Sequence, residues 1–514
     1  MKMDRLASAA RSTVFSGGLI VCRTLATFAL RTALLYSLGV EYLGLNGLFA
    51  SVVQVLNIAD LGVESAIAFS LYQPIAEDDE ESICALLRLY RKYYIGIGLF
   101  ILVAGLCTAP FVPGLIEGDI PSGINVYFAF FLYLLSVVSS YLAGGYRKCL
   151  LKAHMRGDII SKISLAVSVT VTVLQLIVVC GLKNYYLYLA LLIVSIVAEN
   201  MIATRVSGKL YARYKPKGKL PQEYLRQFGQ RIRDLFTAKV STVVLNSADA
   251  IVISAFLGLG VLAQYQNYYY ILTAVTALME VIYDSAMAGI GNSLITESKE
   301  KNYIDLRMLS FAVAWVSGWC ACCFLCLYQP FMEIWVGKEL LLPFGMVILF
   351  ACYFVAIELN RVVNVYKDAA GMWHQDRFRP LTAAILNLIL NLLTVRRMGL
   401  YGVLLSSIVA ILGVEIPWLL RNIFSELFPR GNLWKYIVSL LHYVLMMILA
   451  CVPAWLICRL LPFSSWGGLL SRAVICVFVP NLIFLAAYHG KEEFRNWVGI
   501  LKGMIGRRGR NQES

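Results

Sequence analysis

Ionisable side chains stand inside stretches of this sequence that are otherwise apolar. The basic ones are Arg23, Arg31, Lys162, Arg205, Lys239, Arg361 and Arg472. The acidic ones are Asp60, Glu64, Glu199, Asp249, Glu280, Asp284, Glu358 and Glu415. A charge at the centre of a membrane helix costs about 2.5–3.5 kcal/mol, so these side chains would together cost on the order of 40 kcal/mol if they all faced lipid. Most of them must therefore face water, one another or the membrane interface, and a polar cavity would receive them.

The deepest cations share one face of the first apolar run. Arg23, Thr27 and Arg31 follow one another at i, i+4 and i+8. The two arginines lie too deep to reach the interface easily, and their own helix carries no acidic residue. A functional role is therefore favoured for them and for Lys239. Pairing between helices or reach to the interface is favoured for the other three, Lys162, Arg205 and Arg472.

Carboxylates also repeat at helical spacing. Asn57, Asp60 and Glu64 follow one another at i, i+3 and i+7, and Glu280 and Asp284 at i, i+4. Such groups can accept protons or sodium for ion coupling, because a desolvated carboxylate titrates near neutral pH. They can equally serve only to neutralise the arginines. The spacing leaves both interpretations open.

Two further helices carry mixed charges. Glu358, Arg361 and Asn364 share a face, and an internal Glu358–Arg361 ion pair is as good an interpretation as a binding role. Lys239 shares a face with Asn246, and Asp249 follows one turn later.

The sequence gives little support for a metal site, a cofactor or ATP hydrolysis. Cysteines cluster at 320, 322, 323 and 326, but they lie in an apolar run without a histidine, so packing of small residues between helices is the favoured interpretation. The four histidines are scattered, and no GxxxxGK[ST] loop is present. We expect no cofactor, apart from possible coupling to H+ or Na+.

The elements that must position these residues are membrane-spanning helices. The 514 residues are 59% hydrophobic and only 15% charged, with a mean hydropathy of +0.71, whereas soluble domains carry roughly 25% charged residues. Runs long enough to cross a bilayer core of about 30 Å number fourteen. They are 12–37, 43–72, 92–112, 124–146, 158–182, 185–207, 232–257, 262–292, 308–332, 340–366, 380–395, 400–420, 435–458 and 467–488. We expect an all-α integral membrane protein, in which the first run acts as a signal anchor.

The basic residues assign a side to each loop. Of 45 Lys and Arg, 33 fall in segments on the side of the N-terminus and only five in the opposite loops. Those five are Lys183, Lys338, Arg396, Arg397 and Arg459. Because basic loops remain in the cytoplasm, both termini are predicted to be cytoplasmic, and the net charge of +14 needs no nucleic acid to explain it.

An internal repeat divides the chain. Glu64-Ser-Ala-Ile-Ala matches Asp284-Ser-Ala-Met-Ala at an offset of 220 residues, and Glu199 and Glu415 correspond at an offset of 216. We expect two parallel six-helix lobes with the polar cavity between them, as in many transporters. The predicted organisation is an N-lobe (1–207), a basic cytoplasmic linker (208–231), a C-lobe (232–421), two added helices (422–490) and a cytoplasmic tail (491–514). The tail is predicted to be an amphipathic interfacial helix or a solvated, partly disordered segment.

Several segments resemble one family. They are 31–81, 89–94 (LYRKYY), 246–271 (NSADAIVISAFLGLGVLAQYQNYYYI) and 379–408 (RPLTAAILNLILNLLTVRRMGLYGVLLSSI). The first begins RTALLYSLGVEYLGLNGLFASVVQVLNIADLGVESAIAFSLYQP. These segments resemble the bacterial polysaccharide (O-antigen and capsule) flippases of the multidrug/oligosaccharidyl-lipid/polysaccharide (MOP) exporter superfamily. The resemblance covers about the first 420 residues.

The resemblance implies a MATE-like fold of two six-helix lobes, with two C-terminal helices, in a bacterial plasma membrane. The implied substrate is an oligosaccharide repeat unit on undecaprenyl diphosphate, flipped to the outer leaflet, and polysaccharide assembly enzymes are possible partners. Arginine suits phosphate recognition, so the substrate-binding candidates are Arg23, Arg31, Lys239, Asp249 and Arg361. The gating or ion-coupling candidates are Asp60, Glu64, Glu280 and Asp284. Tyr265–Tyr270 are predicted to stack on sugars or to form an interfacial belt.

Three alternatives remain open at this point. A flippase for the peptidoglycan precursor shares the diphosphate chemistry and the fold. An ion-coupled drug or metabolite antiporter of the same superfamily should have a cavity dominated by acids, whereas the first helix carries two arginines. A polysaccharide polymerase would need a sizeable outer loop with catalytic groups, and no predicted outer loop is large enough, so we expect no enzyme.

Overall fold

The protein is helical throughout its described part, which contains no strand. The computed structural model describes residues 22–57, 63–222, 243 and 247–499, apart from 119, 122, 155, 462–464, 492 and 498. Its contacts divide the chain into two compact units, Met1–Ala263 and Gln264–Ser514. The predicted all-α membrane class is confirmed.

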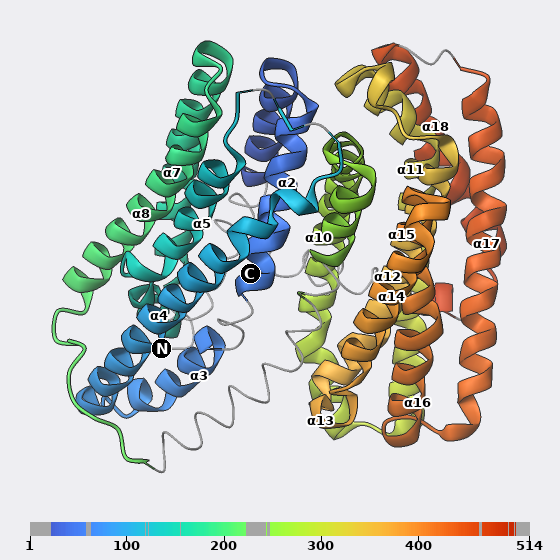
Figure 1. Cartoon of the computed structure of the whole chain (residues 1–514). Coiled ribbons are helices and arrows are strands. Elements are labelled where there is room, and N and C mark those ends of the chain that lie inside the picture. Colours follow the sequence, from blue (N-terminus) through green and yellow to red (C-terminus); the bar gives the residue numbers. More distant parts are fainter. Residues whose placement is uncertain are drawn as a thin grey trace, which may run out of the picture. The chain divides into compact units, whose positions relative to one another are not determined.

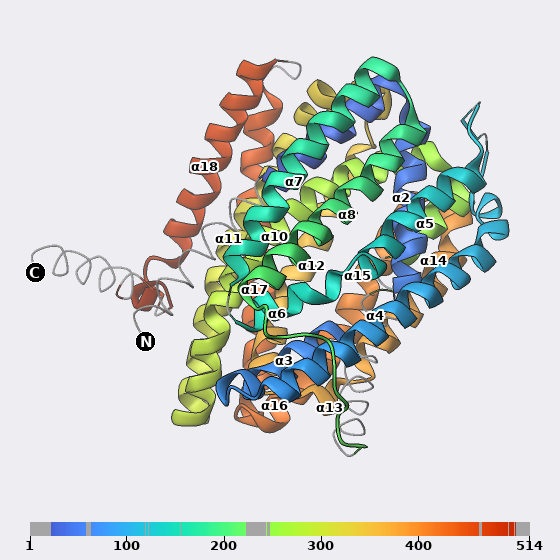
Figure 2. The ribbon, with the colours of Figure 1, turned by 90° about the vertical axis from the view of Figure 1, so that its left-hand side faces the viewer.

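The first unit is built from one helix over residues 22–37 and a series of further helices. These are α2 (Val40–Leu56), α3 (Val63–Ala76), α4 (Glu80–Thr108), α5 (Val126–Leu142), α6 (Lys148–Ala153), α7 (Gly157–Ile177), α8 (Tyr185–Leu210) and the helix Ser247–Leu257. Helices α7 and α8 run alongside each other, and α5 lies against α8 (Figure 1). Figure 2 shows the same unit from the side, with α6 beside α7 and α8.

Capping residues fix where several helices begin. The side chain of Asn125 accepts a hydrogen bond from the amide of Phe128 at the start of α5, and Asn184 does the same for Leu187 at the start of α8. Asp79 caps α4 in this way. Such a side chain satisfies one of the amides that the first turn of a helix leaves without a partner.

The chain bends by 46° between α5 and the segment Gly145–Ala153. Gly144 sits at the bend with a φ of 83°, a conformation that favours glycine. The side chains of α8 satisfy carbonyl groups at this bend: Asn200 donates to Ser140 at 3.1 Å and Thr204 donates to Gly144 at 3.0 Å. A break in a membrane helix is tolerated where a neighbouring helix supplies such donors.

The second unit contains most of α10 (Leu259–Thr296) and the helices that follow it. These are α11 (Lys299–Val336), α12 (Phe344–Ala369), α13 (Trp373–Asp376), α14 (Arg379–Met398), α15 (Leu400–Ala410), α16 (Ile416–Glu426), α17 (Leu433–Arg459) and α18 (Trp466–Tyr488). A π-helical segment, Ile411–Glu415, joins α15 to α16. Pro417 lies two residues after this segment, and a proline has no amide N–H to donate to the preceding turn.

Ten described helices are long and apolar enough to cross a membrane, or eleven if the bent pair Val126–Leu142 and Gly145–Ala153 forms one span. Each of the fourteen predicted runs overlaps described helix, but the count of fourteen spans is not established. The predicted run 43–72 is divided between α2 and α3, with 58–62 outside the described residues.

The predicted helix bounds were too short where helices continue past the apolar run. Helix α4 begins at Glu80 rather than near 92, and α11 begins at Lys299 rather than near 308. The caps Asp79 and Ser298 mark these starts, since charged residues interrupt the apolar pattern but not the helical hydrogen bonds.

Two asparagines interrupt the predicted run 380–395, and both are buried. Asn387 donates to the hydroxyl of Ser407 on α15 at 2.8 Å, and Asn391 donates to Asn387 at 3.2 Å. They therefore join α14 to α15, a use of polar side chains that is common between membrane helices.

Candidate functional site

Glu199 of α8 is the centre of an ion cluster within the first unit. The ammonium of Lys148 on α6 lies 2.7 Å from it, and the hydroxyl of Ser164 on α7 donates to it at 2.8 Å. The guanidinium of Arg23 lies 3.8 Å from its second oxygen. One carboxylate faces two cations, so the cluster carries one positive charge in excess. The side chain of Arg23 remains 54% exposed.

Arg31, two turns after Arg23, has different surroundings. It is half-buried and lies within electrostatic range of Tyr188 on α8. Tyr188 accepts a hydrogen bond from Asn46 of α2 at 2.8 Å, and Tyr185 donates to the same asparagine at 3.3 Å. The rings of Tyr185 and Tyr188 stack with centroids 5.9 Å apart. A polar and aromatic cluster therefore lies near the second arginine of the predicted cationic face.

Glu415 is the centre of a second cluster, within the second unit. Arg379 binds Asp376 through three hydrogen bonds of 2.8, 3.0 and 2.8 Å and lies 3.7 Å from Glu415. Arg379 also donates to Asn364 at 2.8 Å, and Asn360 donates to Glu415. All these side chains are buried or half-buried.

Two more charges complete the second cluster. Lys367 lies 3.5 Å from Asp376 and 2.8 Å from Asp368. The cluster therefore contains two cations, Arg379 and Lys367, and three carboxylates, those of Glu415, Asp376 and Asp368. Its net charge is negative, whereas that of the cluster around Glu199 is positive.

The repeat that pairs Glu199 with Glu415 thus corresponds to two similar arrangements. In each unit the carboxylate is bound by a cation from another helix and by a hydroxyl or amide group. Glu199 and Glu415 were both predicted from the sequence as charges inside apolar runs, but their partners Lys148 and Arg379 were not. Both stand next to the end of a predicted apolar run, 124–146 and 380–395, and were therefore placed in loops.

Glu280 and Arg361 form an ion pair between α10 and α12. The sequence left open a pair between Glu358 and Arg361 on one helix, but Glu358 instead accepts the hydroxyl of Tyr283 at 2.6 Å. Glu358 is completely buried. Asp284, one turn after Glu280, is exposed. The site candidates Glu280 and Arg361 are therefore together, and Glu280 is exposed like Asp284.

Other site candidates are less completely described. Asp249 is buried in the helix Ser247–Leu257. Glu64 belongs to α3, and its side chain lies outside the described residues, as do Asp60 and Lys239 entirely.

The predicted roles of Tyr265–Tyr270 are wrong for two of these tyrosines. Tyr265 and Tyr268 are buried in the second unit. The hydroxyl of Tyr268 donates to Gln329 at 3.1 Å and accepts the amide of Leu342 at 3.2 Å. They pack in the core because a buried tyrosine needs only one or two partners for its hydroxyl, and neither is placed to stack on a sugar or to join an interfacial belt.

An apolar groove of about 490 Å³ lies among α11, α12, α15 and α17. Leu325, Phe344 and Trp455 line it and also line an adjoining pocket of about 540 Å³. Arg459 and Arg472 line that second pocket. The groove has an apolar lining, and the adjoining pocket has these two cations in its lining.

The described part of the predicted linker packs on the first unit. Arg213 binds Asp78 at 2.7 Å, and Arg88 of α4 donates to the carbonyl of Gly218 at 2.9 Å. The hydrogen bond that Arg213 donates to the carboxylate of Asp78 raises the pKa of the guanidinium. His154 lies against the ring of Tyr211 at 4.2 Å, and burial lowers the pKa of its imidazole.

Residues 493–497, at the start of the predicted tail, are helical and pack on α11. Glu493 pairs with Arg307, and the indole of Trp497 donates to the carbonyl of Met308 at 2.9 Å. The ring of Phe494 stacks on Trp315 at 5.9 Å. The start of the tail is therefore a helix with partners on α11, and its predicted place at the membrane interface stays a prediction.

Comparison with known proteins identifies the fold. The family model described as "Polysaccharide biosynthesis protein" matches residues 25–287, which is more than half of the 514-residue chain. A structure described as "Lipid II flippase MurJ, inward closed conformation" is 13% identical with a TM-score of 0.67 and covers 93% of this chain and 98% of its own. An inward-facing multidrug resistance MATE family transporter of the MOP superfamily is 14% identical with a TM-score of 0.61, over 79% of this chain and 95% of its own. No curated protein matches the chain in sequence.

Proposed function

The chain belongs to the polysaccharide biosynthesis protein family. We propose that it is a multi-pass flippase of the MOP superfamily and that it carries oligosaccharide repeat units linked to undecaprenyl diphosphate. Transport runs from the cytoplasmic to the outer leaflet of a bacterial plasma membrane by alternating access. Both termini are cytoplasmic, and the product is used in surface polysaccharide biosynthesis.

The observation that carries this proposal is the positive excess at Arg23. Its cluster contains two cations for one carboxylate, and its guanidinium is more than half exposed. An exposed arginine inside an apolar helix would cost about 2.5–3.5 kcal/mol if lipid surrounded it. A water-filled surface that receives an anionic head group removes this cost. A guanidinium also binds two phosphate oxygens at once, so Arg23 and Arg31 bind the diphosphate.

Lys239, Asp249 and Arg361 complete the substrate-binding set of this proposal. Asp60, Glu64, Glu280 and Asp284 act as gating or ion-coupling groups, with H+ or Na+ as the coupling ion. The ion pair between Glu280 and Arg361 supports a gating role, because a proton or sodium ion at Glu280 would release Arg361.

The apolar groove supports a lipid-linked substrate rather than a soluble one. Its lining between Ala321 and Trp455 carries no charged residue, so it can hold isoprenoid units by burial of apolar surface. Arg459 and Arg472 in the adjoining pocket stand near one end of this lining.

The test is a set of alanine variants at the cationic face. In cells that depend on this chain for their surface polysaccharide, Arg23→Ala and Arg31→Ala should each reduce the polysaccharide at least ten-fold. Lipid-linked repeat units should accumulate at the cytoplasmic leaflet. Arg205→Ala is the matched control, since Arg205 is an exposed arginine on α8, and it should keep normal polysaccharide. Normal polysaccharide from both test variants, at equal protein in the membrane, would reject the assignment.

A flippase for the peptidoglycan precursor is the second candidate, and the coverage of the Lipid II flippase structure favours it. The two candidate functions predict that expression of this chain rescues different defects in mutant cells. Rescue of cells depleted of their own Lipid II flippase, without restored surface polysaccharide, would replace the first proposal with the second. Altered drug susceptibility without either rescue would point to an antiporter.

A further inference from the structure

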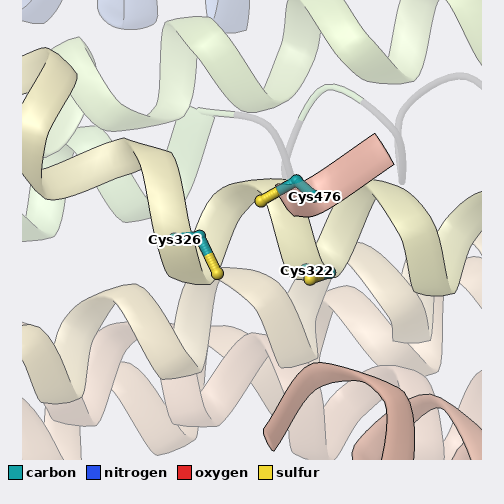
Figure 3. Close-up of side chains that lie close together, drawn as sticks. All are labelled: Cys322, Cys326 and Cys476. Atoms are coloured by element: carbon teal, nitrogen blue, oxygen red, sulfur yellow. The ribbon is translucent and has the colours of Figure 1, made fainter. Parts of the chain in front are cut away.

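Three buried cysteines from two distant parts of the chain converge in the second unit. Cys322 and Cys326 lie on α11 and Cys476 on α18, and their three sulfur atoms all lie within 4.8 Å of one another (Figure 3). The first two are spaced i, i+4, which places them on one face of the helix. Cys476 follows them by 150 residues, so sequence spacing gave no sign of it.

Two further thiols adjoin this group. Cys476 interacts with Cys323 and Cys458 as well as with Cys322 and Cys326. Cys458 belongs to α17 and also interacts with Cys326. Five of the 13 cysteines of the chain therefore meet where α11, α17 and α18 pack together.

We propose that Cys322, Cys326 and Cys476 bind a thiophilic d10 metal ion, zinc(II) or copper(I), with Cys458 available as a fourth ligand. Thiolate sulfur is the ligand that both ions prefer. Sulfur atoms that surround zinc at about 2.3 Å stand about 3.8 Å apart, so rotation of these side chains within the observed 4.8 Å is enough to form the site.

The charge balance supports binding inside an apolar unit. When zinc(II) displaces three thiol protons it forms a trithiolate complex of charge −1 and releases three protons. Arg472, 2% exposed, carries the compensating +1 and acts electrostatically on Cys458. Its guanidinium also donates to the carbonyl of Leu461 at 2.8 Å, which holds it at this depth.

An access route to the sulfur atoms is present. The 540 Å³ pocket is lined by Cys326 and Cys458 together with Arg472. A metal ion can therefore reach two of the thiols without separation of the helices. Once bound, it would tie α18 to α11, a useful restraint because the hydrophobic effect does not drive helices together within lipid.

Metal binding by the purified full-length protein tests this inference without any transport assay. The protein, stripped of metal in detergent, would be titrated with zinc(II) against a competing chelator and, separately, with copper(I) under reducing conditions. We expect one equivalent of one of these ions to bind. Cobalt(II) in place of zinc should give sulfur-to-metal charge-transfer absorption.

Single cysteine-to-serine variants distinguish metal binding at this site from binding at the other cysteines. Cys476→Ser and Cys326→Ser should each weaken binding at least ten-fold. Cys84→Ser, at a buried thiol of α4, and Cys451→Ser, at a buried thiol of α17, should bind as the unchanged protein does. X-ray absorption of the ion bound to the unchanged protein, which should show sulfur neighbours at about 2.3 Å, provides the same test if a serine variant misfolds. Absence of stoichiometric binding of both ions, or equal binding by all four variants, would overturn the proposal.

Discussion

Replacing Arg379 with methionine removes the cation that binds the carboxylates of the second unit. Its side chain is 4% exposed, makes three hydrogen bonds to Asp376 and lies 3.7 Å from Glu415. Methionine keeps much of the volume but supplies neither charge nor donors. The substitution therefore leaves two buried carboxylates with most of their compensation lost.

Removing one partner of a buried ion pair costs about 3–5 kcal/mol, because the remaining charge stays desolvated. Lys367 remains 3.5 Å from Asp376, so the lower part of this range applies. A loss of about 3 kcal/mol corresponds to an unfolding equilibrium shifted about a hundred-fold. In a unit of this size it lowers the melting temperature by roughly 6–12 °C.

Equilibrium unfolding in mixed detergent micelles measures this change, with Arg377→Met as the matched control. Arg377 stands two residues earlier, is exposed and lies over the ring of Phe378 at 4.5 Å, so its loss should cost less than about 1 kcal/mol. Asp376→Asn combined with Arg379→Met should recover part of the loss, since one stranded charge disappears. Equal stability of the two single methionine variants would refute the reasoning.

Three further predictions concern other parts of the chain. Burial lowers the pKa of His154, so below about pH 6.5 the unfolded chain binds a proton more readily than the folded chain does. The free energy of unfolding should therefore fall between about pH 7.5 and about pH 5.5. The variant His154→Phe should show a smaller fall when unfolding is measured across this pH range. Gly44→Ala should lower the melting temperature, since a β-carbon there would stand 2.3 Å from the carbonyl oxygen of Leu259, whereas Gly96→Ala meets open space and should not. Because the Glu280–Arg361 pair is partly exposed, reversing it with Glu280→Arg and Arg361→Glu should change the unfolding free energy by less than about 1 kcal/mol but abolish transport, since Arg361 binds substrate; normal transport by the reversed pair would make it purely structural.

Hydropathy was sufficient to predict most of the helices, because a membrane helix satisfies its backbone internally and its apolar length follows from the bilayer. The predicted run 158–182 matches Gly157–Leu182 within one residue. Hydropathy could not locate the helix starts at Glu80 and Lys299, where capping side chains rather than apolarity decide the boundary.

Glu199, Glu358 and Glu415 were predictable as charges inside apolar runs, but Asp376 and most of the partners of these carboxylates were not. Ser164 and Tyr283 carry no charge, yet they hydrogen-bond to Glu199 and Glu358. The sequence does not indicate which hydroxyl groups bind a buried carboxylate, because serine and tyrosine are common in membrane helices for other reasons. Cys476 was missed for a related cause: only the packing of α18 on α11 brings it to Cys322.

The two clusters imply that stability and substrate recognition can be separated by mutation. Lys148 and Arg379 bind their carboxylates at short distances within their own units, so these ion pairs form without substrate. Arg23 adds a second cation to a carboxylate that Lys148 already neutralises, and it does so at 3.8 Å with most of its side chain exposed. Its loss should therefore cost little folding free energy, as exposed pairs contribute about 0–1 kcal/mol. A variant of Arg23 that unfolds as readily as one of Arg379 would show that the outer cation is structural, and the proposed diphosphate site would lose its main support.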